Sequence, residues 1–266
     1  MRIVANHAHL MPAGSWREGD VGMLLRHLDA CDIDRCVVFA PFAVQMGDDR
    51  RRANLWLLEE VRGEDRLIPF GCMAPAAEDA GEILHLLVEE GVRGAKVHPS
   101  IDLYDMTEPK AYELYAQAQE QGLILDFHTG THGTRLALAD PTKFDDVAWD
   151  FPDLTMVFEH LGGRTYFELF LAILVNHKGR GTLFGGLASV LSADTHPLWH
   201  LGPERVTELV QFVGANRLIY GLDFPWNSVE TNRRDIAVIQ GLDISQEDKE
   251  MVLGGTLLEL LGAGNR

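Results

Sequence analysis

Short apolar runs alternate with longer amphipathic runs along the whole chain. The short runs scarcely alternate in polarity, which is typical of strands buried on both faces, and we expect strands at residues 3–5, 36–39, 67–73, 94–97, 123–127, 155–158, 182–184 and 218–220. Between them, the spacing of apolar positions predicts helices, for example over residues 21–32, 53–62, 80–90, 109–121, 166–176 and 203–213. In the segment 80–90, Ile83, Leu84, Leu87 and Val88 share one helical face, and Gly91 follows as a stop signal.

The alternation of strands and helices indicates a parallel sheet covered by helices. A chain of 266 residues has the usual size of one α/β barrel, so we predict a single-domain (β/α)8 TIM barrel over residues 1–266. The alternative is an open, doubly wound sheet. It has less support, because no Gly-x-Gly-x-x-Gly segment follows the first apolar run.

Polar residues stand where the predicted strands stop. His7 and His9 follow the first strand, His128 the fifth, His160 the sixth and Asp223 the last. Residues at the carboxyl ends of barrel strands converge in space although the sequence scatters them. If strand geometry persists, His7 and His9 point to the same side and can reach one ion. Because neutral imidazole is the commonest metal ligand, this pattern predicts a metal site.

Five segments of the chain resemble the amidohydrolase superfamily, specifically the amidohydrolase-related branch of metal-dependent hydrolases and aminocarboxymuconate-semialdehyde-type decarboxylases. The segments occur in the order of the family and span nearly the whole chain. They are His7-Ala8-His9, residues 91–99 (GVRGAKVHP), residues 127–130 (FHTG), residues 159–163 (EHLGG) and residues 220–226 (YGLDFPW).

The resemblance implies that His7, His9, His128 and Asp223 bind one divalent metal ion, usually zinc and sometimes manganese. It implies that His160 is a further ligand or the residue that orients or deprotonates a water on the metal, and that Asp223 transfers the proton. A bound metal lowers the pKa of its water toward about 7 and polarises the bond under attack. The chain departs from the family at Ala5, where an Asp is common, and at Leu222, where Ser or Thr is common.

Lys96 stands in the predicted fourth strand and has three interpretations. It could be carboxylated and bridge two metals, as in some binuclear relatives, although one ion is our prediction. It could be a cation that holds a carboxylate of the substrate or an anionic intermediate. It could also be an interior lysine whose amine reaches a carboxylate.

Further candidates for substrate contacts lie in the same rim. Trp16 offers an apolar wall, and Arg17 offers a fork that matches a carboxylate. Trp226 follows Asp223 closely and either walls the site or packs in the core. His98, one strand step beyond Lys96, lines the pocket or has a structural role.

Composition limits the partners. A formal net charge of −17 argues against nucleic acid and against an anionic membrane surface. No apolar run approaches the roughly 20 residues of a membrane span, and no apolar leader opens the chain. The 3 cysteines cannot all pair, so we expect a reducing cytoplasm. The expected partner is a small-molecule substrate, and a homodimer stays open on general grounds.

Three functions compete. The leading hypothesis is a hydrolase in which a metal-activated water attacks an amide, ester or lactone bond of a small molecule. The second is a non-oxidative, metal-dependent decarboxylase of a small unsaturated or aromatic carboxylic acid, because such relatives share the same ligands. The third is a barrel that binds metal or ligand without turnover. An intact cluster of costly polar groups argues against this third hypothesis.

Overall fold

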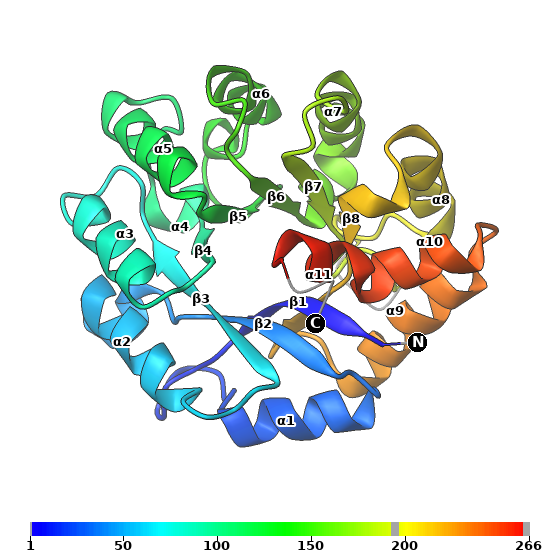
Figure 1. Cartoon of the computed structure of the whole chain (residues 1–266), viewed down its shortest axis with the longest axis horizontal. Helices are drawn as coiled ribbons and strands as arrows, with labels where there is room; N and C mark the ends of the chain where they lie inside the picture. The colour runs from blue at the N-terminus through cyan, green and yellow to red at the C-terminus, as the bar shows by residue number, and fades with distance from the viewer. Residues whose placement is uncertain (1, 193–196, 263–266) are drawn as a thin grey trace.

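The computed structural model describes residues 2–192 and 197–262, and in this part of the chain nine parallel strands form a ring enclosed by helices (Figure 1). The strands are β1 (Val4–His9), β2 (Arg35–Phe39), β3 (Leu67–Met73), β4 (Gly94–Val97), β5 (Ile124–His128), β6 (Met156–Glu159), β7 (Leu183–Gly186), β8 (Leu218–Ile219) and β9 (Gly221–Phe224). Their order is β8-β7-β6-β5-β4-β3-β2-β1-β9, so from β1 to β8 neighbours in sequence are neighbours in the sheet. The predicted single-domain TIM barrel is confirmed as a fold class.

The helices surround the strands on the outside (Figure 1). The longer ones are α1 (Val21–Ala30), α2 (Arg50–Glu60), α3 (Ala80–Glu89), α5 (Pro109–Gln121), α6 (Pro141–Asp150), α7 (Gly163–Asn176), α8 (Pro203–Phe212) and α9 (Val229–Gly241). The shorter ones are α4 (Pro99–Asp102), α10 (Gln246–Glu250), α11 (Thr256–Leu260), the 3₁₀ turns η1 (Ala43–Met46), η2 (Leu136–Leu138), η3 (His160–Gly162) and η4 (Ala215–Arg217), and a π turn η5 (Met251–Gly255). Side chains of Asp20, Asp49 and Ser228 cap helix starts, which explains where α1, α2 and α9 begin.

The prediction of eight strands needs one correction, because the last strand is split in two. β8 pairs with β7, whereas β9 pairs with β1, so the two halves together close the ring. Between them, the backbone N–H of Tyr220 donates to the carbonyl of Val252 in η5 at 3.0 Å instead of to a neighbouring strand. The π turn η5 therefore interrupts the hydrogen-bond ladder between the strands, and no local sequence pattern predicts this interruption.

A bulge in β1 also departs from the expected regular strand. The register against β2 shifts between Ala5 and Ala8, and His7 has a φ of 63°. A bulge re-aims side chains. Here Asn6 and His7, although adjacent in sequence, both reach carboxylates inside the barrel.

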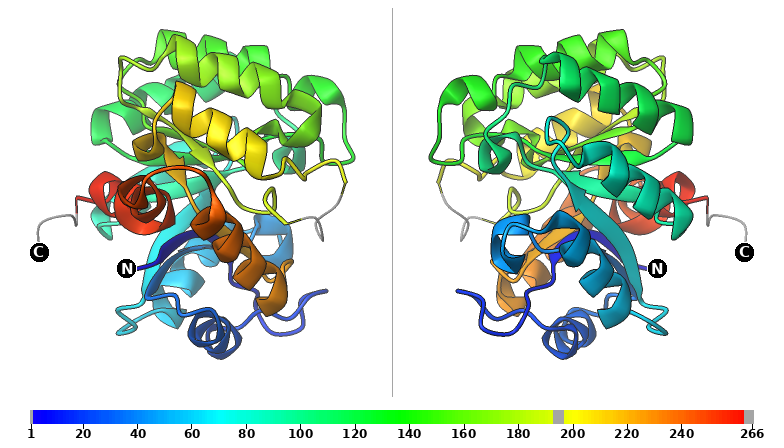
Figure 2. Two further views of the ribbon diagram at one scale, coloured as in Figure 1. Left: turned by 90° about the vertical axis from the view of Figure 1, so that its right-hand side faces the viewer. Right: turned by 90° about the vertical axis from the view of Figure 1, so that its left-hand side faces the viewer.

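The interior of the barrel is packed and closed at its amino end. Val4, Phe39, Phe70, Ile124 and five further residues form a buried cluster with partly buried residues of the C-terminal segment packed against it. Helix α11 contributes to this plug and lies beside the start of β1 (Figures 1 and 2). This packing fills the barrel interior at its amino end.

Two further expectations can be compared with the described residues. The three cysteines are free and buried there. Across residues 2–192 and 197–262, no helix is both long enough and apolar enough to cross a bilayer.

Candidate metal centre and catalytic cavity

A cavity of about 510 Å³ opens at the carboxyl end of the strands. Histidines and aromatic side chains make up most of its wall. The lining residues are His7, His9, Trp16, Phe42, Val44, Gln45, Lys96, His98, Ile101, His128, His132, His160, Ser189, Trp199, Asp223, Trp226 and Asn227. All five residues that the sequence marks as metal ligands or proton-transfer groups therefore face one space.

The backbone around this cavity holds left-handed conformations that side-chain-bearing residues rarely adopt. His7, His160, Ser189 and Asp223 have φ values of 63°, 67°, 60° and 56°. Such conformations cost of order 1–3 kcal/mol each and cluster at functional sites. Three of these four residues, His7, His160 and Asp223, are among those that the strand-end pattern selects.

His7, His9 and Asp223 bring their donor atoms within 4.8 Å of one another. The Nε2 atoms of His7 and His9 are 3.3 Å apart, and Nε2 of His7 lies 3.5 Å from Oδ1 of Asp223. Burial lowers the pKa of both imidazoles well below the usual value, with nearby cationic groups adding to the effect. Neutral imidazoles with converging Nε2 atoms are suited to a cation.

His128 lines the same cavity and is a further candidate ligand. Its Nε2 is buried and has no hydrogen-bond partner, whereas nearly all buried polar atoms in proteins have one. Burial lowers the pKa of His128 well below its usual value, so the ring is neutral. His7, His9 and Asp223 therefore fit a divalent ion, and the unpartnered Nε2 of His128 belongs to the wall of the same cavity.

A second trio, His98, His128 and His132, also has donor atoms within 4.8 Å, but its rings are poorly placed to chelate. The rings of His98 and His128 are stacked at 3.9 Å with only 10° between their planes, so their in-plane lone pairs cannot converge on one ion. Nδ1 of His98 accepts the backbone N–H of Ile101 at 3.3 Å and caps α4. Burial lowers the pKa of His98 well below its usual value, so a neutral ring with Nδ1 accepting carries its hydrogen on Nε2. His98 is thus a hydrogen-bond donor in the cavity wall.

His160 has the opposite tautomer. Its Nδ1 lies 2.8 Å from the carbonyl oxygen of Ala188, which can only accept, so Nδ1 carries the hydrogen and Nε2 is the free lone pair. Burial lowers the pKa of His160 to about 4. The ring lies 4.9 Å from the rings of both His7 and His128. Its Nε2 can therefore act as a base or as a further ligand.

Asp223 is held by a polar pair from the β7 and β9 loops. Oγ of Ser189 donates to its Oδ2, and the amide of Asn227 in turn donates to Oγ of Ser189 at 3.1 Å. Burial raises the pKa of Asp223, with the Ser189 hydrogen bond opposing this effect. The carboxyl group therefore takes up a proton more readily than an exposed aspartate does.

Lys96 forms an internal ion pair at the base of the cavity. Its Nζ donates to Oδ1 of Asp126 at 2.8 Å, and the lysine is only 1% exposed. This contact corresponds to the interpretation of Lys96 as an interior cation whose amine reaches a carboxylate.

The remaining rim candidates differ in their placement. Trp16 and Trp226 line the cavity, with ring centroids 6.1 Å apart. Arg17 does not line the cavity among the described residues, because its guanidinium faces the backbone instead. Its Nε donates to the carbonyl of Pro225 at 2.9 Å, and Nη2 donates to that of Trp226. Arg17 thus fixes the loop after β9 rather than presenting the expected fork to a carboxylate.

Sequence reasoning missed the buried carboxylates Asp126 and Glu159 beneath the histidines. Both are 0% exposed, and both accept from the side chain of Asn6. A signal existed for Asp126, because it stands inside an apolar strand two residues before His128 and so faces the same side. Ser189 and Trp199 carry no comparable signal, since both lie in loops.

The chain belongs to the amidohydrolase family, because the amidohydrolase family model matches residues 7–263. The superfamily that the five segments resemble is thereby confirmed, and the protein is an enzyme of that superfamily. A comparison of the sequence with curated proteins gave no match.

Solved structures with the same fold include decarboxylases and amidohydrolases. 5-Carboxyvanillate decarboxylase from Sphingomonas paucimobilis is 15% identical with a TM-score of 0.75, covering 97% of this chain and 98% of its own. An amidohydrolase from Burkholderia multivorans with bound zinc is 14% identical with a TM-score of 0.75, covering 98% and 99%. A dihydroxybenzoic acid decarboxylase from Polaromonas sp. with bound manganese is 14% identical with a TM-score of 0.73, covering 100% and 98%. At this identity they show the shared fold.

Proposed function

We propose that this enzyme is a metal-dependent, non-oxidative decarboxylase of a small aromatic or unsaturated carboxylic acid. The observation that carries the proposal is the combination, in one cavity, of metal donors, a carboxyl group held by Ser189 and aromatic walls. Two of the similar structures are decarboxylases of aromatic acids, which supports this reaction over the hydrolysis that the sequence favours. Aromatic rings pack well against planar substrates.

His7, His9, His128 and Asp223 would hold a divalent ion, zinc or manganese. When bound, the ion supplies positive charge that binds substrate oxygens and stabilises negative charge that develops on them. The Nε2–H of His98 donates to a carboxylate oxygen of the substrate, and Trp16 and Trp226 pack against its apolar body.

Asp223 supplies the proton. Its buried carboxyl group transfers a proton to the substrate carbon that bears the carboxylate. The bond between that carbon and the carboxylate then breaks, carbon dioxide leaves, and the electron pair of the bond restores the double bond in the product. Asp223 is left ionised and regains a proton from solvent, so protons and electrons balance. Ser189 keeps the carboxyl group aimed during the cycle.

Carbon dioxide release tests the proposal. The zinc- or manganese-loaded enzyme would be incubated with hydroxybenzoates and unsaturated acids in D2O, and gas release would be followed together with mass spectrometry of the product. We expect carbon dioxide from at least one acid and one deuterium at the carbon that lost it. The absence of gas from every acid, with metal bound, would contradict the proposal.

Hydrolysis is the second candidate, because the neutral His160 has a free Nε2 that can deprotonate a water. The same enzyme preparation would be screened against lactones, esters and anilides in H2¹⁸O. Incorporation of ¹⁸O into a carboxylate product, without carbon dioxide release from any acid, would favour hydrolysis.

A further inference from the structure

Four buried polar side chains form a layer directly beneath the cavity. Asn6 comes from β1, Lys96 from β4, Asp126 from β5 and Glu159 from β6, and each is at most 1% exposed. Burying one cation and two carboxylates is costly unless they are paired, so such a layer calls for an explanation.

The hydrogen bonds of this layer leave two of its oxygens without a partner, Oδ1 of Asn6 and Oε2 of Glu159. The side-chain amide of Asn6 donates to Oδ2 of Asp126 at 2.7 Å and to Oε1 of Glu159 at 2.5 Å. Lys96 donates to the other oxygen of Asp126. Oε2 of Glu159 has no hydrogen-bond partner, and neither has Nδ1 of His7.

These two unpartnered atoms, Nδ1 of His7 and Oε2 of Glu159, lie 3.4 Å apart. Buried polar atoms are almost always paired, and a single proton between this nitrogen and this oxygen satisfies both. The carboxylate can lie there because β7 carries glycine at the adjacent position. A Cβ at Gly186 would collide with the carboxyl group of Glu159.

We infer that Glu159 is a positioning residue for His7. It accepts the Nδ1 hydrogen of His7 and thereby leaves the Nε2 lone pair directed at the metal site, while Asn6 and the Lys96–Asp126 pair hold Glu159 in place. The inference rests on the metal-binding part of the proposed function. A carboxylate behind a histidine ligand fixes the ring and raises its basicity. The first strand itself offers no carboxylate to His7, and the carboxylate nearest to its Nδ1 comes from β6.

The histidines of the site therefore receive their orientation in different ways. His160 donates to a backbone carbonyl, whose position depends on the fold alone. His7 depends on a side chain, which a substitution can remove. This dependence makes the inference testable by changing Glu159 and measuring metal binding without any substrate.

The experiment compares Glu159→Leu, which removes the acceptor, with Glu159→Gln, which keeps an oxygen that can accept but removes the charge. Zinc affinity would be measured by competition with a chromogenic chelator. We expect an affinity about 10- to 100-fold weaker for Glu159→Leu and a smaller loss for Glu159→Gln. Asp235→Asn is the matched control, because Asp235 is an equally buried carboxylate on α9 and should leave zinc affinity unchanged.

A second measurement separates positioning from general damage. Long-range ¹⁵N–¹H spectra of the histidine-labelled, metal-free protein report which ring nitrogen of His7 carries hydrogen. We expect Nδ1–H in the wild type and in Glu159→Gln, and a tautomer mixture in Glu159→Leu.

Wild-type affinity in Glu159→Leu, or an equal loss in Asp235→Asn, would overturn the inference. So would an unchanged tautomer in Glu159→Leu. If the wild type binds no metal at all, the proposed function fails, yet the tautomer spectra still decide the role of Glu159.

Discussion

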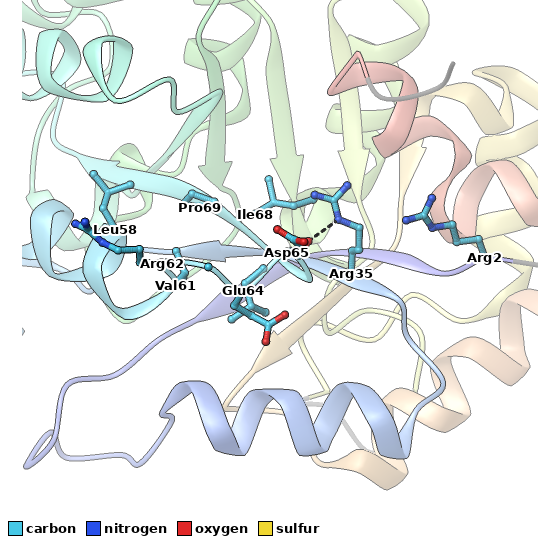
Figure 3. Close-up of a pocket in the computed structure, with 11 residues that line it drawn as sticks. Arg2, Arg35, Leu58, Val61, Arg62, Glu64, Asp65, Ile68 and Pro69 are labelled. Carbon is cyan, nitrogen blue, oxygen red and sulfur yellow. Dashed lines mark hydrogen bonds between the residues drawn. The ribbon is translucent and has the colours of Figure 1, made fainter. Parts of the chain in front are cut away.

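The two ends of the barrel both carry a cavity, and they differ in how their polar groups are satisfied. The cavity at the amino end has a volume of about 650 Å³ and lies among Arg2, Arg35, Arg62 and the loop before β3 (Figure 3). Its charged groups reach solvent or the backbone. Arg35 donates to the carbonyl of Asp65, and the 75% exposed Arg62 pairs with Glu59.

The carboxyl-end cavity has the opposite character. Nε2 of His128 and the Nδ1 atoms of His7 and His9 are buried without partners, and three of its histidine and aspartate residues have positive φ. Among the described residues that line the amino-end cavity, only Gly63 has a positive φ, and none has an unpartnered buried side-chain atom. Unsatisfied and strained groups, rather than volume, thus distinguish the end that carries the chemistry.

The largest expected effect comes from Asp223→Asn. The amide cannot deliver the proton and is a weaker metal ligand, so we expect kcat to fall about 10³- to 10⁴-fold while the fold is retained. Arg62→Ala at the amino-end cavity is the matched control and should leave kcat unchanged. Kinetics on the substrate found by carbon dioxide release, with circular dichroism of each variant, would measure this. Comparable losses of kcat in Asp223→Asn and Arg62→Ala would contradict the functional difference between the two ends.

Much of this difference between the two ends of the barrel can be predicted from the sequence. The apolar runs predict the strands, and a parallel barrel then brings His7, His9, His128, His160 and Asp223 to one rim without further information. These residues are read from their position after a strand, which is a local signal.

The parts that could not be predicted depend on contacts between distant segments. The bulge in β1 turns Asn6 inward, and only the fold shows that its amide meets Glu159, 153 positions away. The split of the last strand depends on Val252 in the closing turn. Arg17 had the chemistry of a carboxylate fork, but its direction is set by the loop after β9.

Asp235 tests whether an unsatisfied buried group matters for activity only inside the carboxyl-end cavity. It is a buried carboxyl group with an unpartnered oxygen, and it lines neither cavity. Burial raises the pKa of Asp235 to about 7 from 3.8, with hydrogen bonds opposing this effect. The folded state therefore binds a proton more tightly than the unfolded state. This contribution to stability is complete below about pH 4 and is lost as the pH rises through about 7.

We expect the free energy of unfolding of the wild type to fall, relative to that of Asp235→Asn, by about 4 kcal/mol between pH 4 and pH 8. Urea unfolding of both proteins at each pH gives the difference, and kcat should stay unchanged. If the difference in unfolding free energy between the two proteins does not vary with pH, burial does not raise the pKa of Asp235. If kcat falls together with stability, unsatisfied burial outside the cavity also bears on activity.

The smallest expected effect comes from substituting His98. It tests whether substrate binding needs a hydrogen-bond donor in the cavity wall in addition to the free lone pairs of the other histidines. His98→Phe keeps a flat ring against His128 but loses the Nε2–H. A hydrogen bond to a charged group contributes about 1.5–3 kcal/mol, so we expect kcat/KM for an acid substrate to fall roughly 10- to 100-fold, mainly through KM. His98→Asn can still accept the backbone N–H of Ile101 and cap α4. If Asn restores KM, the loss in His98→Phe comes from the cap, whereas an equal loss in both variants assigns it to the donor. His85→Ala, on the outer face of α3, should match the wild type.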